Sequence, residues 1–326
     1  MSFQVKPAMA RSVLLLVAIA AASGMAISRG PSPRWFLPAS QGTITADTEL
    51  VVLPVRVTDA KGDFVFGLRQ EQFRLFEDGR RPPIALFRQE DTPVTVGLVV
   101  DHSRSMGPKL ADVAEAVSAF AQSSNPEDEM FVVDFSDAVS LEMPGGRPFT
   151  SNARDLAQAV SAVSARGMTA LYDAVAEGLS HIQLGRADKK ALVIVSDGGD
   201  NASGRKYRDV LELARHNQAV IYAIVLVGGA EEENPAMLKQ LCKDTGGLAF
   251  FPSRGQSVAE ISKVIARDLR EQYTLAFTPE QSATNVYRKI RVEVSAAGRG
   301  KLFVQARAGY YTAPQKQAAG SAQERP

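Results

Sequence analysis

From residue 93 to residue 272, runs of apolar residues alternate with segments in which apolar residues recur every three or four positions. The runs are apolar at almost every position, which predicts strands buried on both faces at 94–100, 130–135, 191–196, 220–227 and 248–252. The other segments predict helices at 110–120, 156–163, 171–184, 207–216, 237–242 and 258–271. Buried strands separated by helices indicate an α/β fold, a doubly wound and mostly parallel sheet covered on both sides.

Shorter β-rich segments with turn signals lie on both sides of this region. Before it, residues 49–90 predict strands at 50–57, 73–80 and 83–88. After it, residues 273–312 predict strands at 273–277, 289–294 and 301–306. Either set alone would leave an apolar face and open edges exposed to water. We therefore expect the two sets to pair into one smaller β-sandwich, with the α/β domain, residues 91–272, inserted between them.

The two ends of the chain have a different character. Basic residues precede an apolar stretch at 13–22, and small residues follow as far as Ala26, as is typical of an export signal. Residues 1–26 are expected either to be cleaved off or to remain as a single N-terminal membrane anchor. Both alternatives send the rest of the chain to the periplasm, the cell envelope or the medium. We expect residues 27–48 to form a linker and residues 313–326 a disordered tail.

Composition excludes several classes of function. The 326 residues are enough for two modules, and their 37 basic and 36 acidic residues give a formal net charge of +1. No dense basic run is present, so nucleic acid is not an expected partner. The single cysteine, Cys242, excludes an intramolecular disulfide and a Cys-rich zinc site. Its helical spacing from Leu238 predicts a buried position.

Polar side chains suited to a metal ion stand next to three of the predicted elements. They are Asp101, Ser103 and Ser105, which form a D-x-S-x-S run after the strand at 94–100, Thr169, which precedes a helix, and Asp197, which follows the strand at 191–196. In an open parallel sheet, ligands bind beyond the carboxyl ends of the strands. Ser, Thr and Asp supply only hard oxygen donors, which favours Mg²⁺ or Mn²⁺, whereas zinc favours His or Cys and Ca²⁺ takes six to eight ligands.

This set of residues resembles the metal-ion-dependent adhesion site, MIDAS, of the von Willebrand factor type A (VWA) family. All five positions of that motif are filled, and the resemblance extends over about residues 93–272. It implies that Ser103 and Ser105 bind the metal directly, and that Thr169 does so when a ligand is present. It also implies that the two aspartates act directly or through water. A Glu or Asp of a protein partner would then complete the coordination, which gives adhesion without catalysis.

The flanking β segments carry a narrower resemblance. The pattern Val57-x-Asp59, residues 68–79 and the pair Tyr310-Tyr311 are similar to an exported bacterial subgroup described as VWFA-related acidobacterial domain proteins. This resemblance implies export and a divided β module, and it implies no defined ligand. The oligomeric state is not predicted.

Other interpretations of the same residues stay open. Ser103, Ser105 and Thr169 could cap helices, and Asp197 could belong to a simple turn. A metal-assisted hydrolase is a second functional hypothesis, because Asp101 also stands where some α/β phosphatases place their nucleophile. Those enzymes use D-x-D-x-T, and no Ser/His/Asp arrangement or phosphate-binding glycine loop supports catalysis here, so we expect no enzyme. A third hypothesis is a structural component of a cell-envelope assembly.

Several further residues attract attention near these motifs. We expect the three histidines to be packed or solvated: His102, His181 and His216. Asp200 could tune the local field, although a solvated loop carboxylate is the simpler interpretation. Three aspartates lie around the second strand, where one of them could hydrogen-bond to a metal-bound water: Asp128, Asp134 and Asp137.

Overall fold

The computed structural model describes residues 50–312 except 142, 162–163, 229–232, 254 and 281–283. The described residues belong to one compact unit, Asp47–Pro326. The predicted export signal or anchor, the linker and the tail lie outside the described residues. Within the described part of the chain, no helix is long and apolar enough to cross a membrane.

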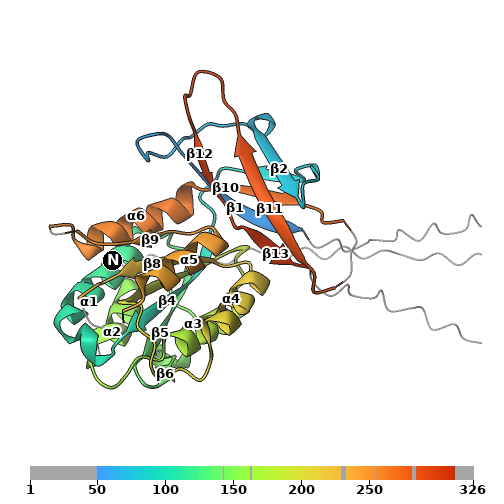
Figure 1. Cartoon of the computed structure of the whole chain (residues 1–326). Helices are drawn as coiled ribbons and strands as arrows, with labels where there is room; N and C mark the ends of the chain where they lie inside the picture. The colour runs from blue at the N-terminus through green and yellow to red at the C-terminus, as the bar shows by residue number, and fades with distance from the viewer. Residues whose placement is uncertain are drawn as a thin grey trace, which may run out of the picture. The chain divides into compact units, whose positions relative to one another are not determined.

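A six-stranded sheet forms the centre of the α/β region (Figure 1). Its strand order is β6-β5-β4-β7-β8-β9, with bounds β4 Val94–Asp101, β5 Glu129–Phe135, β6 Val139–Ser140, β7 Lys189–Ser196, β8 Val220–Val225 and β9 Ala249–Phe250. Every neighbouring pair is parallel except β5 and β6. All eight residues of β4 are buried, as expected for a central strand with apolar residues on both faces. The predicted mostly parallel sheet is therefore confirmed.

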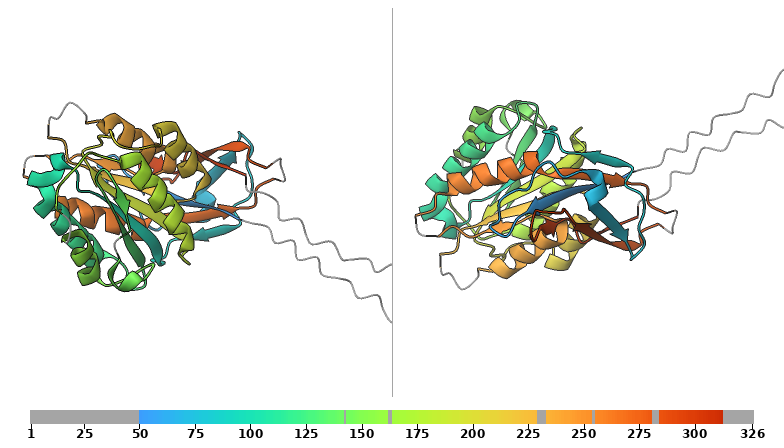
Figure 2. Two further views of the ribbon diagram at one scale, coloured as in Figure 1. Left: turned by 90° about the horizontal axis from the view of Figure 1, so that it is seen from below. Right: turned by 90° about the horizontal axis from the view of Figure 1, so that it is seen from above.

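Helices cover both faces of this sheet (Figure 2). One face packs against α1 Leu110–Ser123, α2 Ala153–Ser161 and α6 Val258–Glu271. The other face packs against α3 Leu171–His181, α4 Tyr207–His216 and α5 Pro235–Thr245. Short 3-10 helices occur at Gln70–Gln72, Arg104–Lys109, Pro144–Gly146 and Ile182–Leu184. Cys242 is fully buried in α5, as predicted, and burial raises the pKa of its thiol.

Strands from before and after the α/β region form two antiparallel sheets, visible in Figure 1 as blue and red strands side by side. The first has the order β12-β1-β10-β3, with bounds β1 Val51–Thr58, β3 Leu86–Arg88, β10 Tyr273–Phe277 and β12 Phe303–Gln305. The second has the order β13-β11-β2, with bounds β2 Phe73–Glu77, β11 Tyr287–Val294 and β13 Gly309–Tyr311. One apolar cluster joins both sheets, so the predicted β-sandwich of the flanking segments is present.

Some predicted strands are shorter in the structure. The segment predicted at 83–88 forms a strand only at Leu86–Arg88, and the one predicted at 248–252 forms only Ala249–Phe250. The short strands β6 and β13 were not predicted. Each makes only two or three pairs with its neighbour, so its extended conformation comes from tertiary pairing that local pattern does not record.

Buried polar contacts connect the antiparallel sheets to the α/β region. Asp268 of α6 accepts a hydrogen bond from the Tyr222 hydroxyl of β8 at 3.0 Å and lies 3.5 Å from the Arg56 guanidinium of β1. Arg307 is also buried, and its Nη2 donates to the carbonyl oxygens of Arg215 at 3.0 Å and Asn217 at 3.1 Å. A cation at the C-terminal end of α4 is favoured by the helix dipole. Burial lowers the pKa of Arg307 to about 10.

Replacing Asp268 with asparagine should remove a pH-dependent loss of stability. Burial, the largest cause, raises the pKa of Asp268 from 3.8 to about 6, although Arg56 opposes the shift. The folded protein binds the proton of the Asp268 carboxyl more tightly than the unfolded chain does. The stability that this proton contributes is therefore fully present below about pH 4, and it is lost as the pH rises through about 6. The loss is about 3 kcal/mol, at 1.36 kcal/mol per pH unit.

The measurement is urea unfolding of both proteins between about pH 4 and pH 7. We expect the stability of Asp268→Asn relative to wild type to rise across this range by about 3 kcal/mol. The exposed Asp112→Asn serves as control and should show no such trend. A constant difference between Asp268→Asn and wild type would contradict the assignment.

Candidate metal centre

The D-x-S-x-S run forms a tight turn at the carboxyl end of β4. Asp101 is the last residue of the strand and is fully buried, and Ser103 is 1% exposed. The Asp101 carboxylate accepts a hydrogen bond from the Ser103 backbone N–H at 2.9 Å. The backbone N–H of His102 donates to the carbonyl oxygen of Phe135 at 2.7 Å, which holds the turn against the end of β5. One local hydrogen bond and one bond to β5 therefore hold this turn, and the Asp101 carboxylate is buried within it.

Asp197 reaches the same edge of the sheet because β7 lies parallel to β4. Val100 stands opposite Val195 in the register, so the residues that follow both strands are neighbours. The Ser105 hydroxyl donates to the Asp197 carboxylate at 2.7 Å. The hydroxyl oxygens of Ser103 and Ser105 are 3.2 Å apart. Hydrogen bonds thus connect four of the five predicted residues: Asp101, Ser103, Ser105 and Asp197.

The loop that carries Thr169 lies against the Asp101 turn. The backbone N–H of Arg166 donates to the carbonyl oxygen of His102 at 2.9 Å. In return, the backbone N–H of Arg104 donates to the carbonyl oxygen of Gly167 at 3.4 Å. These two contacts bring Thr169, two residues further on, to the same edge of the sheet.

Thr169 is also bonded to the loop that follows Asp197. Its backbone N–H donates to the Asn201 side chain at 2.8 Å, and its carbonyl oxygen accepts from the N–H groups of Asn201 and Ala202 at 2.9 and 3.0 Å. Thr169 is 6% exposed. Across the part of the chain that the structure describes, its hydroxyl makes no hydrogen bond, so the structure brings the Thr169 loop to the other residues without joining its hydroxyl to them.

The alternative roles as helix caps are not supported by the contacts. Ser103 stands at the N-cap position of the 3-10 helix Arg104–Lys109, yet its side chain makes no capping bond. The N-cap residue of α3 is Ala170, and Asp200 accepts the N–H of Tyr172 there at 3.1 Å. Asp197 does stabilise its own turn by accepting the N–H of Gly199 at 3.1 Å, but its second oxygen accepts from a serine hydroxyl. The Ser105 hydroxyl thus donates to a carboxylate, and the Ser103 hydroxyl contacts Ser105 and not a helix end.

The electrostatics of the site favour a bound cation. Burial raises the pKa of Asp101, and repulsion from Asp197 adds to the rise, while hydrogen bonds from Ser103 and Ser196 oppose it. Among the described residues, neither Asp101 nor Asp197 takes part in a salt bridge. A divalent cation would neutralise two buried carboxylates that otherwise have only hydroxyl and N–H neighbours. The donor set, all oxygen, fits Mg²⁺ or Mn²⁺.

The candidate ligands include only two carboxylates, so they differ from the usual clusters of His, Cys, Asp and Glu ligands. Within the described ranges, no group of three or more His, Cys, Asp or Glu side chains could hold a metal ion. A metal at this edge would therefore depend on hydroxyl oxygens in addition to the two carboxylates.

Ser196 is a further residue of the candidate site, and it is not among the residues predicted from the sequence. It is the last residue of β7 and is fully buried. Its hydroxyl donates to the Asp101 carboxylate at 2.6 Å and accepts from the backbone N–H of Gly198 at 3.0 Å. The sequence signal that could have identified it is its position: Ser196 is the one polar residue at the end of the apolar run 191–196, directly before Asp197. Ser196 holds the Asp101 carboxylate in place and ties it to the Asp197 turn.

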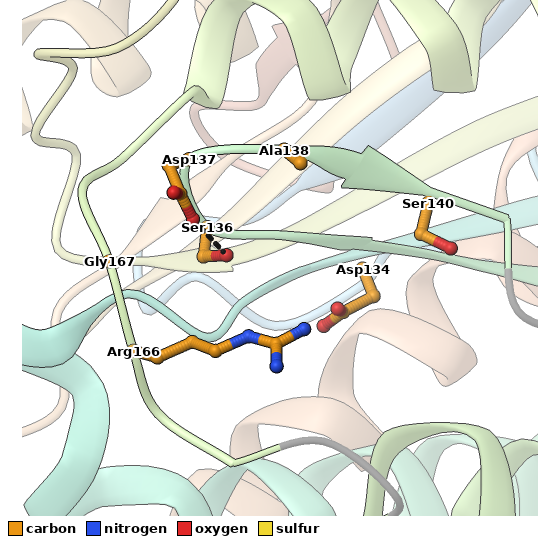
Figure 3. Close-up of a pocket in the computed structure, with 7 residues that line it drawn as sticks. All are labelled: Asp134, Ser136, Asp137, Ala138, Ser140, Arg166 and Gly167. Atoms are coloured by element: carbon orange, nitrogen blue, oxygen red, sulfur yellow. Dashed lines mark hydrogen bonds between the residues drawn. The ribbon is translucent and has the colours of Figure 1, made fainter.

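His102 and the three aspartates around β5 do not all lie at the candidate centre. His102 is 1% exposed, and its Nδ1 contacts the Asp134 carboxylate, while Nε2 lies 3.2 Å from the carbonyl oxygen of Val160. Asp128 accepts the backbone N–H of Val94 at 2.8 Å, which places it at the opposite edge of the sheet. Of the three aspartates around the second strand, only Asp134 and Asp137 therefore lie near the candidate centre, where they line a pocket (Figure 3).

Comparison with known proteins identifies similar folds. A family model described as "von Willebrand factor type A domain" matches residues 96–264, more than half of the chain. No curated protein matches the chain. Among solved structures, the von Willebrand factor type A protein from Catenulispora acidiphila is 11% identical, with 76% of this chain and 74% of that chain covered and a TM-score of 0.50.

Two further solved structures have lower TM-scores. The vWF domain of the type V pili tip protein Mfa5 from Porphyromonas gingivalis is 12% identical, with 60% of this chain and 99% of that chain covered and a TM-score of 0.46. The conserved hypothetical protein BatB from Bacteroides thetaiotaomicron is 15% identical, with 54% and 97% covered and a TM-score of 0.43. At these identities, the likeness concerns the fold alone.

Replacing Ser196 with alanine should destabilise the protein by about 1–3 kcal/mol, because it leaves one buried carboxylate oxygen and one buried N–H without their hydrogen bonds. Urea unfolding at neutral pH measures the change. The control is Ser161→Ala on the exposed side of α2, which should change stability by less than about 0.5 kcal/mol. Equal stabilities of Ser196→Ala and wild type would show that Ser196 does not support Asp101.

Proposed function

The chain belongs to the von Willebrand factor type A domain family, and on this premise we propose that it is an exported module that binds a protein partner through a divalent cation. The residues proposed to hold Mg²⁺ or Mn²⁺ are Asp101, Ser103, Ser105, Thr169 and Asp197. The observation that carries this proposal is the set of hydrogen bonds that links Asp101 to Asp197: the Ser103 backbone N–H donates to Asp101, the Ser103 and Ser105 hydroxyls contact each other, and the Ser105 hydroxyl donates to Asp197. Export is proposed from the signal-like N-terminal sequence alone.

Each proposed ligand has a position that suits its role. Asp101 and Asp197 supply two negative charges from buried positions, and Ser196 keeps the Asp101 carboxylate directed into the site. The serine and threonine hydroxyls add neutral oxygens, so the cation would keep affinity for a further anion. A bound dication would supply a positive charge that a partner's Asp or Glu carboxylate can contact. Thr169 has a hydroxyl with no hydrogen bond among the described residues, which suits a ligand that binds when the partner arrives.

The contacts of Asp101 disfavour the hydrolase hypothesis. A nucleophilic carboxylate needs an oxygen that can reach the substrate, but Asp101 is fully buried. Its two oxygens accept hydrogen bonds from the Ser103 N–H and the Ser196 hydroxyl. The proposal is therefore a binding protein and not an enzyme. A structural component of an envelope assembly stays as the alternative, in which the cation only stabilises the fold.

Mg²⁺ or Mn²⁺ should stabilise the protein, because an ion that binds only the folded state adds about 2.7 kcal/mol at a hundredfold excess over its Kd. Asp101→Ala should abolish this increment while the variant stays folded in chelator. Thermal unfolding over a series of Mg²⁺ concentrations provides the measurement, with Asp112→Asn on the exposed face of α1 as control. An increment that survives in Asp101→Ala would place the metal elsewhere.

Thr169→Ala should separate metal binding from partner binding. We expect this variant to retain most of the Mg²⁺-dependent stabilisation, since four ligands stay in place, and to lose retention of partner proteins from an envelope extract by about tenfold or more. The wild type should retain those proteins in Mg²⁺ and release them in chelator. Retention that chelator leaves unchanged would favour the structural alternative, and hydrolysis of phosphoesters or peptides by the pure protein would favour the hydrolase.

A further inference from the structure

A pocket of about 400 Å³ opens beside the candidate metal centre (Figure 3). The turn between β5 and β6 forms one wall and carries Ser136 and Asp137, and the loop with Arg166 and Gly167 forms another. The same loop is hydrogen-bonded to the metal-binding turn through the carbonyl oxygen of His102. A residue next to a partner's metal-bound Asp or Glu would therefore lie at this pocket.

Gly167 allows the two walls to approach each other. Its φ of +69° lies in the left-handed region that favours glycine. A Cβ atom at this position would lie 2.3 Å from the Asp137 carboxylate oxygen. A larger residue would thus displace Asp137, so the sequence keeps this carboxylate directly over the loop that carries Arg166.

The two exposed charges in the pocket have opposite signs. Figure 3 shows the Arg166 side chain crossing the pocket below the turn that carries Asp137, with its guanidinium directed toward Asp134. Within the described residues, the Arg166 guanidinium has no hydrogen-bond or ion-pair partner. Asp137 accepts a hydrogen bond from the Ser136 hydroxyl at 3.0 Å and is otherwise open to solvent. The third charge, Asp134, is buried and contacts His102.

The hydrogen-bond donors and acceptors that line the pocket determine which chemical group can bind there. A guanidinium offers only hydrogen-bond donors, and a carboxylate offers only acceptors. A carboxylate entering the pocket would be attracted by Arg166 but repelled by Asp134 and Asp137. An ammonium group would be attracted by the two aspartates but repelled by Arg166. A carboxamide has one acceptor for Arg166 and two donors for the aspartates, and it carries no charge to be repelled.

We propose that this pocket is a second contact site for the same partner and that Arg166 and Asp137 select an Asn or Gln side chain next to the partner's metal-bound acid. The inference rests on the proposed metal-dependent binding, which supplies the acid beside the pocket. It goes further by assigning specificity to two residues outside the metal site.

A phage-displayed library of peptides with one fixed Glu and randomised neighbours tests the proposal on the full chain. Selection in Mg²⁺ on the wild type should enrich Asn and Gln at one position beside the Glu by about tenfold, the effect of one charge-assisted hydrogen bond. The enrichment should disappear on Arg166→Ala and on Asp137→Ala. The matched control is Arg81→Ala, an exposed arginine of the β-sandwich, which should enrich like the wild type.

The outcomes distinguish the two proposals. Metal-dependent selection without a preference for Asn or Gln, or a preference that both pocket variants retain, overturns the pocket assignment and leaves the metal-dependent function standing. Equal tolerance of all residues beside the Glu, as contact with a backbone amide would give, also overturns it. Selection that chelator does not affect overturns both. Mg²⁺-dependent thermal stabilisation of the two pocket variants should equal that of the wild type, which separates loss of specificity from loss of the metal.

Discussion

The parallel pairing of β4 with β7 is the constraint on which the candidate site depends. This pairing sets Val100 opposite Val195, so that Asp101 and Ser196 end their strands side by side. The Ser196 hydroxyl can therefore donate to the Asp101 carboxylate. Side chains alternate between the faces of a strand, and a register shifted by one residue would turn Ser196 to the opposite face. Apolar packing on both faces of the sheet fixes this register, so the core determines where the polar chemistry occurs.

The sequence predicted those features that are encoded locally or by long periodic patterns. Apolar runs such as 94–100 predicted the buried strands, and the position of the D-x-S-x-S run directly after one of them predicted that its polar side chains lie at the carboxyl end of the sheet. The role of Ser196 could not be predicted, because it depends on which strand lies beside β4. The contact of His102 with Asp134 of β5 and the pocket beside Arg166 depend likewise on segments that the sheet brings together. The predicted N-terminal and C-terminal segments lie outside the described residues.

The candidate site combines rigid and exposed parts in a way that suits binding. The proposed metal ligands are mostly buried and cross-linked by hydrogen bonds, which holds the donor oxygens in place before a ligand arrives. The pocket beside them carries exposed charges on two loops. Affinity would thus come from a preorganised centre that many related proteins can share, while selectivity would come from loop residues that can differ without disturbing the core.

The pairing of β1 with β10 has a consequence for the order of folding. Val51 pairs with Phe277, so this sheet joins residues that are separated by the whole α/β region. Contacts of such long sequence separation are slow to form unless the intervening chain is already compact. The α/β region is therefore expected to fold first and to bring the two flanking segments together. A chain that ends before β10 would leave Leu53 and Phe73 without the residues that cover them, and would present an exposed apolar edge prone to aggregation.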